Sequence, residues 1–166
     1  MRYPLFLDLT NQSAVVIGAG SVATRKIRTL LRAEATVTVI SPQATASIRR
    51  LAQAKRVRWV RRRYRRGDLR SARLAIAATD DPAVNRAICV EAKRRSLLVN
   101  CITSPAAGNF LVPSLVRRGG ISLAISTGGA SPAFAKRLRV DLEHFLGDEY
   151  PRLLKAMAAA RRAKKT

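Results

Sequence analysis

Two glycines and a small residue, spaced as in a phosphate-binding turn, follow a short apolar run near the start of the chain. Gly18, Gly20 and Ala23 form the pattern GxGxxA directly after Ala14–Ile17, a β-branched run typical of a buried parallel strand. Glycines permit the tight turn and a close backbone approach to a pyrophosphate, and a small third residue lets the next helix pack near the strand. Free N–H groups of that helix would face the phosphates. The pattern predicts a dinucleotide site, with a βα turn that binds nothing as the alternative.

A second expected strand, Ala35–Ile40, ends in residues that could contact the adenosine ribose. These are Ser41, Pro42 and Gln43. A NAD site commonly places Asp or Glu at this strand end to hold the ribose 2'-hydroxyl, and here the position is taken by Ser41. Arg49 and Arg50 follow in the next expected helix. We therefore expect NAD as the coenzyme and leave NADP open.

A third strand end carries Thr79 and Asp80, after the apolar run Leu74–Ala78. Carboxyl ends of parallel strands face the coenzyme crevice, so both residues could contact ribose or nicotinamide. The alternative is a helix start, because Asp81 as N-cap and Pro82 as the first helical residue need no ligand.

Further periodic segments complete an α/β pattern of the Rossmann type, with a doubly wound parallel sheet. Tyr3–Leu9 is either a short strand or an apolar lead-in, and a hairpin is expected after Pro105, followed by a long helix that Ser131 caps. In that helix an apolar stripe would complete the core or form a subunit interface. The other expected elements are helix Ala44–Ala54, strand Val57–Tyr64, helix Ala83–Arg94, strand Leu97–Ile102 and a helical tail that frays.

The chain is strongly basic. It has 32 Lys and Arg against 10 Asp and Glu, a formal net charge of +22. Such a field attracts polyanions, so nucleic acid, an acidic small molecule and solvated surface arginines all compete as explanations. In the most basic segment only Trp59 and Tyr64 could stack on bases, and no specific nucleic-acid partner is expected.

Neither a metal centre nor a membrane anchor is expected. Cys89 and Cys101 lack CxxC spacing, and His144 is the single histidine. No apolar run approaches the roughly 20 residues of a membrane span, and the N-terminus lacks the regions of a signal peptide. We therefore expect a cytoplasmic protein.

The order of several short segments resembles the precorrin-2 dehydrogenase and sirohydrochlorin ferrochelatase family, which includes the N-terminal domain of siroheme synthase. The segments are YPLFLDL, VVIGAGSVATRK, AIAATDDPAVN, LVNCI, NFLVPS and LAISTGGASP. The resemblance implies NAD-dependent oxidation of precorrin-2 to sirohydrochlorin, on the route to sirohaem or cobalamin. It also implies a homodimer, with residues 1–112 as the coenzyme domain, 113–147 as the dimerisation region and 148–166 as a short basic tail.

Matching the family's motifs residue by residue implies the site. Gly18, Gly20, Ser21 and Val22 would meet the pyrophosphate, Ser41, Pro42 and Gln43 the ribose, and Asn100, Thr103, Asn109 and Thr127 the macrocycle. Bifunctional members have an aspartate where this chain has Thr103, and threonine is a poor base and metal ligand. Asp80 is the nearest alternative carboxylate. We therefore expect a dehydrogenase with doubtful chelatase activity, and keep a catalytically weakened tetrapyrrole-binding or regulatory protein as the alternative.

Overall fold

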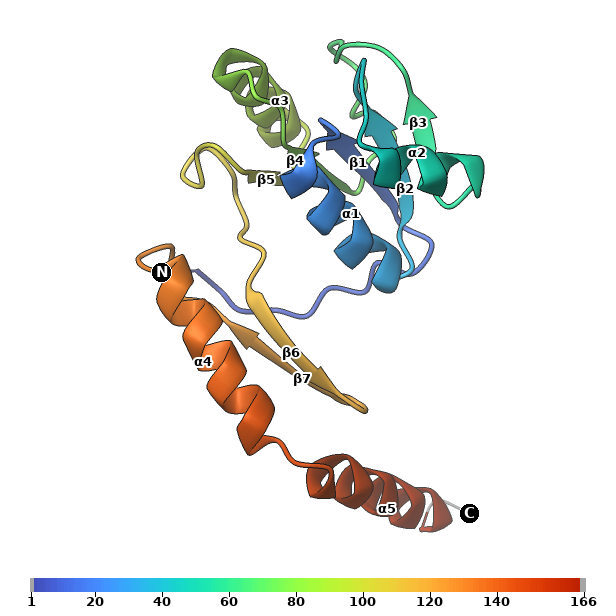
Figure 1. Ribbon diagram of the computed structural model, residues 1–166, viewed down its shortest axis with the longest axis vertical. Coiled ribbons are helices and arrows are strands. Elements are labelled where there is room, and N and C mark those ends of the chain that lie inside the picture. Colours follow the sequence, from blue (N-terminus) through green and yellow to red (C-terminus); the bar gives the residue numbers. More distant parts are fainter. Residues whose placement is uncertain (1, 165–166) are drawn as a thin grey trace. The chain divides into compact units, whose positions relative to one another are not determined.

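The computed structural model describes residues 2–164, which form two compact units that divide between Leu111 and Val112. The first unit contains a sheet of five parallel strands in the order β3-β2-β1-β4-β5 (Figure 1). The strands are β1 (Ser13–Ile17), β2 (Thr36–Ile40), β3 (Arg58–Val60), β4 (Leu74–Ala77) and β5 (Leu98–Cys101). This order, with a switch between β1 and β4, confirms the expected doubly wound sheet.

Helices cover both faces of this sheet because the central strands are apolar on both sides. In β1, Val16 packs in a cluster with α1 (Ser21–Arg32) and α2 (Ala46–Gln53). Val15 and Ile17 point to the other face, where they pack with α3 (Pro82–Arg94). The alternation gives two apolar layers, one on each face.

The register of the strands decides where a ligand could bind. Ile17 at the end of β1 pairs with Ile40 of β2 and with Ala77 of β4. Three carboxyl ends therefore lie at one level, on either side of the point where the strand order reverses. In open α/β sheets this is where ligands bind.

Two expectations for strands differ in the structure. Of the two alternatives for Tyr3–Leu9, the strand is excluded, and of these residues only Leu9 is buried. The expected strand Val57–Tyr64 pairs only over β3, because the chain then turns and the Arg62 guanidinium donates to both carboxylate oxygens of Asp68, at 2.8 and 2.7 Å. A charge-assisted bidentate pair of this kind stabilises a loop in place of a continued strand.

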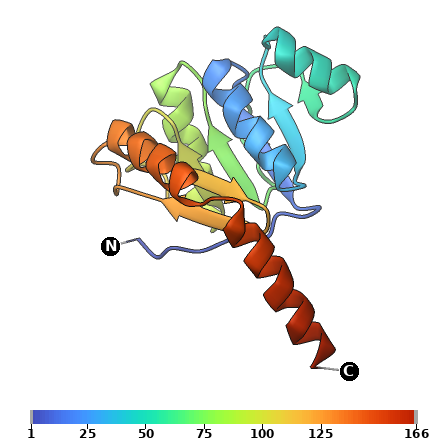
Figure 2. The same cartoon turned by 60° about the horizontal axis from the view of Figure 1, so that its bottom comes forward.

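The second unit consists of the expected hairpin and helices. β6 (Ser114–Arg118) and β7 (Ile121–Ile125) are antiparallel, and α4 (Pro132–Phe145) packs against them (Figure 2). The Ser131 hydroxyl caps α4 by accepting from the Phe134 N–H at 3.1 Å. The tail forms a continuous helix, α5 (Glu149–Ala163), none of whose residues is buried. Within residues 2–164 no helix is both long and apolar enough to cross a bilayer.

A buried carboxylate holds the loop after β3 against α3. Glu91, 7% exposed, accepts from the Tyr64 hydroxyl at 2.5 Å, from the Gly67 N–H at 3.0 Å and from Arg95 Nε at 3.2 Å. Burial acts to raise its pKa, but these donors outweigh burial and the pKa of Glu91 lies below its usual value. The same burial and the same hydrogen bond raise the pKa of Tyr64.

We predict that Glu91→Gln destabilises the first unit by about 1–3 kcal/mol at neutral pH. The glutamine amide has one acceptor oxygen and no negative charge, so it accepts fewer and weaker hydrogen bonds from these donors than the carboxylate does. The pKa of Glu91 is lower in the folded protein than in the unfolded chain, where it is near 4.5. The ionised carboxylate therefore stabilises the fold above pH 4.5, and this stabilisation is lost as the pH falls through the folded-state pKa. Denaturant unfolding from pH 3 to pH 8 should show the variant and the parent converging at acid pH. Exposed Glu34→Gln is the control, and an equal pH dependence in both variants would contradict the assignment.

Candidate functional site

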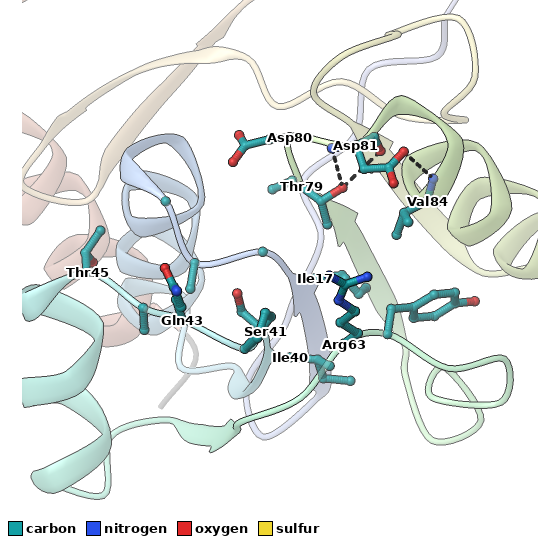
Figure 3. A pocket seen from close by; sticks show the side chains of 17 residues that line it. Ile17, Ile40, Ser41, Gln43, Thr45, Arg63, Thr79, Asp80, Asp81 and Val84 are labelled. Atoms are coloured by element: carbon teal, nitrogen blue, oxygen red, sulfur yellow. Dashed lines mark hydrogen bonds between the residues drawn. The ribbon is translucent and has the colours of Figure 1, made fainter.

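A cleft of about 710 Å³ opens at the carboxyl ends of β1, β2 and β4. Figure 3 shows it with its lining side chains, which come from the glycine turn and from the segments after β2, β3 and β4. Of the residues that the sequence predicts to contact a ligand, seven line it: Gly18, Gly20, Ser41, Pro42, Gln43, Thr79 and Asp80. The structure thus gathers four sequence segments at one cleft.

Gly18 is required by the fold itself. Its φ is +105°, a backbone conformation that side chains other than hydrogen rarely adopt, and a Cβ there would lie 2.0 Å from the Ala78 carbonyl oxygen. The Gly18 N–H donates to the Ile40 carbonyl at 2.9 Å. The residue therefore lets the turn pass between the ends of β2 and β4.

Gly20 has no such role in the fold. It is the N-cap of α1, its φ is −77°, and a Cβ built on it meets nothing within 4 Å. The helix start that it precedes has no side-chain cap and no acidic residue in its first turn. Open space beside uncapped N–H groups suits an anion of the size of a phosphate. The residues present therefore fit a dinucleotide pyrophosphate.

The segment after β2, where the ribose is expected, brings no carboxylate to the cleft. The Ser41 and Gln43 side chains point into the cleft from the segment after β2 (Figure 3). Trp59 Nε1 donates to the Ser41 carbonyl at 2.9 Å and so fixes this segment. Arg63, which the sequence analysis missed, also lines the cleft and brings a cation to it. Its position could not be read from the sequence, because Arg63 stood in what looked like a regular strand.

Asn85 joins two loops at the other end of the cleft. This side chain is fully buried, and its Oδ1 atom accepts from the Thr79 N–H at 3.1 Å and from the Thr79 hydroxyl at 2.8 Å. Its Nδ2 atom donates to the Thr79 carbonyl at 2.8 Å and to Thr103 Oγ1 at 3.1 Å. Thr79 and Thr103, 24 residues apart in the sequence, are held by one amide with a full set of partners. Sequence reasoning overlooked Asn85, because its side chain lies inside the fold.

The two aspartates after β4 have different structural roles. Asp81 is the N-cap of α3, with Oδ1 accepting from the Ala83 N–H at 2.8 Å and the Val84 N–H at 3.2 Å, so the helix-start interpretation holds for this residue and for Pro82. Asp80 is exposed and lines the cleft, with its carboxylate turned away from the Asp81 cap (Figure 3). A carboxylate in that position is available to a ligand.

The remaining predicted residues lie elsewhere. Ser21 and Val22, which begin α1, and exposed Thr103 are not among the cleft-lining residues. The Asn100 amide donates to the Phe110 carbonyl at 3.1 Å, and the Asn109 amide bonds the main chain of Val99 and Leu97 at 2.7 Å each. Both amides thereby hold the segment after β5 against that strand, and their contact with a macrocycle stays a prediction.

Thr127 belongs to the second unit. Its hydroxyl accepts from the Ser131 N–H at 3.2 Å and stabilises the turn before α4, in which Gly128 and Gly129 have positive φ angles. Among residues 2–164, no three His, Cys, Asp or Glu side chains are grouped so that they could hold a metal ion.

Two family models match the chain. Residues 5–114 match a family described as putative NAD(P)-binding, and residues 118–144 match one described as sirohaem biosynthesis protein central. Together they span both units.

The chain is also similar to individual proteins. It is 37% identical to a siroheme synthase of Methylobacillus flagellatus over 98% of its own length and 35% of that protein, so it spans little more than a third of this relative. It is 32% identical to a precorrin-2 dehydrogenase of Bacillus subtilis over 97% of its own length and 99% of that protein. A solved structure named SirC, precorrin-2 dehydrogenase, superposes with a TM-score of 0.82 at 34% identity, covering 96% of this chain and 79% of the other.

The two glycines of the turn allow a matched test of ligand binding against folding. We predict that Gly18→Ala lowers the free energy of unfolding by at least about 2 kcal/mol, because of the clash with Ala78 and the strained φ. Gly20→Ala should cost under about 1 kcal/mol, yet weaken coenzyme binding at least tenfold, because its methyl group occupies space that the pyrophosphate needs. Denaturant unfolding and a fluorescence titration with reduced coenzyme measure the two effects. Unchanged coenzyme affinity in Gly20→Ala would contradict the placement of the pyrophosphate.

Proposed function

Because this chain belongs to the family of the precorrin-2 dehydrogenases and the matching region of the siroheme synthases, we propose that it oxidises precorrin-2 to sirohydrochlorin with a nicotinamide coenzyme. The observation that carries the proposal is the cleft at the switch point, where the open Gly20 position adjoins uncapped N–H groups of α1. We place the reaction in the cytoplasm, in keeping with the free thiols of Cys89 and Cys101.

We propose NAD as the coenzyme, with NADP as the competitor that the assay must test. The backbone of the glycine turn would hold the pyrophosphate, and Ser41 and Gln43 would contact the adenosine ribose. No carboxylate follows β2 to repel a 2'-phosphate, and Arg63 lies in the same cleft. These two features admit NADP, whereas the family resemblance favours NAD, so we expect both coenzymes to bind and NAD to support the faster reaction.

The coenzyme supplies the hydride acceptor, so the chain's task is to bind, orient and accept a proton. Asn85 fixes Thr79 and Thr103 beside the carboxyl ends of β4 and β5, which gives the reacting end of the cleft a rigid edge. Asp80 is the exposed carboxylate at this edge, and we propose that it receives the proton that leaves the macrocycle, directly or through water. The cationic surface, including Arg63, favours approach of a substrate with many carboxylates.

The proposed activity does not include metal insertion. Chelation must remove two pyrrole protons, and a base close to the metal path assists this step. Thr103 offers a hydroxyl that already accepts from Asn85 and lies 3.5 Å from the Cys101 thiol. A hydroxyl in these contacts is neither a base nor a good ligand for Fe²⁺.

We also propose that the protein is a homodimer formed through its second unit. Within residues 112–164 the buried apolar side chains are Val116, Ala135 and Leu146, which is a small core for a hairpin and two helices. Phe134 and Phe145 of α4 are 59% and 66% exposed. A second copy would cover these faces and remove apolar surface from water.

The proposed reaction is tested by anaerobic incubation of the protein with precorrin-2 and either NAD or NADP, followed by sirohydrochlorin absorbance. We expect coenzyme-dependent product, faster with NAD. Precorrin-2 with each coenzyme alone is the control. If no product forms although coenzyme or macrocycle still binds, the proposed oxidation of precorrin-2 is wrong. The result would then favour a tetrapyrrole-binding or regulatory protein.

Metal insertion is tested by adding Fe²⁺ or Co²⁺ to sirohydrochlorin. We predict no acceleration by the parent protein and at least about a tenfold acceleration by Thr103→Asp, which supplies a base at the edge of the site. Thr103→Asn, of similar size but without a basic carboxylate, is the matched control. Acceleration by the parent protein would show that chelation does not need a carboxylate at this position.

The dimer is tested by light scattering after size-exclusion chromatography. We predict that the parent elutes with twice the chain mass and that Phe134→Asp combined with Phe145→Asp gives monomers, because buried charges oppose association. Val90→Asp, at an exposed apolar residue of the first unit, is the control and should leave the mass unchanged. A monomeric parent protein would contradict the proposal.

A further inference from the structure

A second cavity, of about 440 Å³, lies between α3 and the loop after β3. Its lining residues are Tyr64, Arg66, Ala87, Val90, Glu91, Arg94 and Arg95. The lining combines an aromatic ring and two aliphatic side chains with three guanidinium groups. It belongs to the first unit and shares only Tyr64 with the coenzyme cleft.

The charges in this cavity do not balance. Glu91, the only acid of the lining, is occupied by Tyr64, the Gly67 N–H and Arg95. Neither Arg66 nor Arg94 forms a salt bridge to any carboxylate within residues 2–164, and both are exposed. Two cationic groups therefore stand beside an apolar wall without an anionic partner.

We propose that this cavity binds a small organic dianion, whose carboxylate or phosphate groups pair with Arg66 and Arg94. Guanidinium groups form bidentate bonds to either anionic group, and the aliphatic wall of Ala87 and Val90 suits a carbon skeleton. The volume falls in the range of small-molecule pockets. A polynucleotide is a poorer fit, because the only aromatic ring here is tied through its hydroxyl to buried Glu91.

Tyr64 couples this site to the coenzyme cleft. Tyr64 lines both cavities, and the adjacent residue Arg63 lines the coenzyme cleft. Arg95 lines the anion cavity beside Arg66 and Arg94 and also donates to Glu91. A bound dianion that also attracts Arg95 loosens the anchor of the Glu91 carboxylate and so shifts the acceptor that positions Tyr64. The anion also reduces the positive potential that attracts the coenzyme. Binding of the dianion therefore lowers coenzyme affinity, and by linkage the coenzyme lowers affinity for the dianion.

The site is tested by calorimetric titration in phosphate-free buffer, with succinate as the dicarboxylate probe and glycerol 3-phosphate as the phosphate probe. We expect saturable binding of at least one probe, weakened at least tenfold in Arg66→Ala combined with Arg94→Ala. Arg32→Ala combined with Arg56→Ala removes the same charge from exposed positions outside both cavities and should leave binding unchanged. Which probe binds identifies the anionic group. Absence of saturable binding, or equal weakening in both double variants, would overturn the proposal.

A titration with duplex DNA tests whether the two arginines bind nucleic acid in place of a small dianion. Salt-sensitive DNA binding that Arg66→Ala with Arg94→Ala abolishes, together with no binding of either small probe, would replace the dianion by a nucleic acid. This measurement and the calorimetry need neither precorrin-2 nor coenzyme, so their outcome is independent of the proposed dehydrogenase.

The coupling, which rests on the proposed coenzyme site, is tested by titrating reduced coenzyme with and without saturating probe. We expect the dissociation constant to rise about fivefold, the lower end of ordinary allosteric coupling. Tyr64→Phe retains the ring and removes the bond to Glu91, so it should bind the probe normally but lose most of the coupling. An unchanged dissociation constant in the parent protein would refute the coupling and leave the calorimetric result standing.

Discussion

The approach of the glycine turn to the end of β4 is the constraint on which the first unit depends. Gly18 stands so near the Ala78 carbonyl that no side chain fits between them, and its N–H donates to the end of β2. This close passage lets β1, β2 and β4 end at one level and starts α1 beside them. One requirement of backbone packing thereby creates the crevice, and only the second glycine, Gly20, is left to serve a ligand.

Buried polar side chains hold the loops around that crevice in place. Asn85 gathers Thr79 and Thr103 at one end, and Glu91 gathers Tyr64, Gly67 and Arg95 beneath the loop after β3. Each of these two side chains is inside the protein and has several partners, so loss of either leaves donors or acceptors unsatisfied. These networks give the loops the defined positions that binding requires.

The large positive charge serves more than solubility. Arg62 closes the basic loop on Asp68, Arg95 supports Glu91, and Arg63 faces the coenzyme cleft. Arg66 and Arg94 lie at a separate cavity, and neither has a salt bridge to a carboxylate within residues 2–164. The same residue type thus holds a loop, lines a cleft and forms solvated surface, and only its neighbours distinguish these positions.

The sequence by itself determined the doubly wound parallel sheet, the glycine turn and the N-caps of two helices. These features depend on local chemistry: apolar β-branched runs, glycine before a helix, and Asp81 or Ser131 followed by proline. The family resemblance was also readable, because its motifs are contiguous, and the comparisons confirm it.

Tertiary structure alone decided what non-local contacts control. Arg63 and Tyr64 looked like strand residues until Asp68 and Glu91, from later in the chain, folded their segment into a loop. Asn85 seemed an ordinary helix residue until its bonds to Thr79 and Thr103 were known. Nothing in the sequence indicated that the amides of Asn100 and Asn109 bond the main chain around β5. A residue's type sets which bonds it can form. Which partners come within reach depends on the path of the whole chain, and no local pattern contains that information.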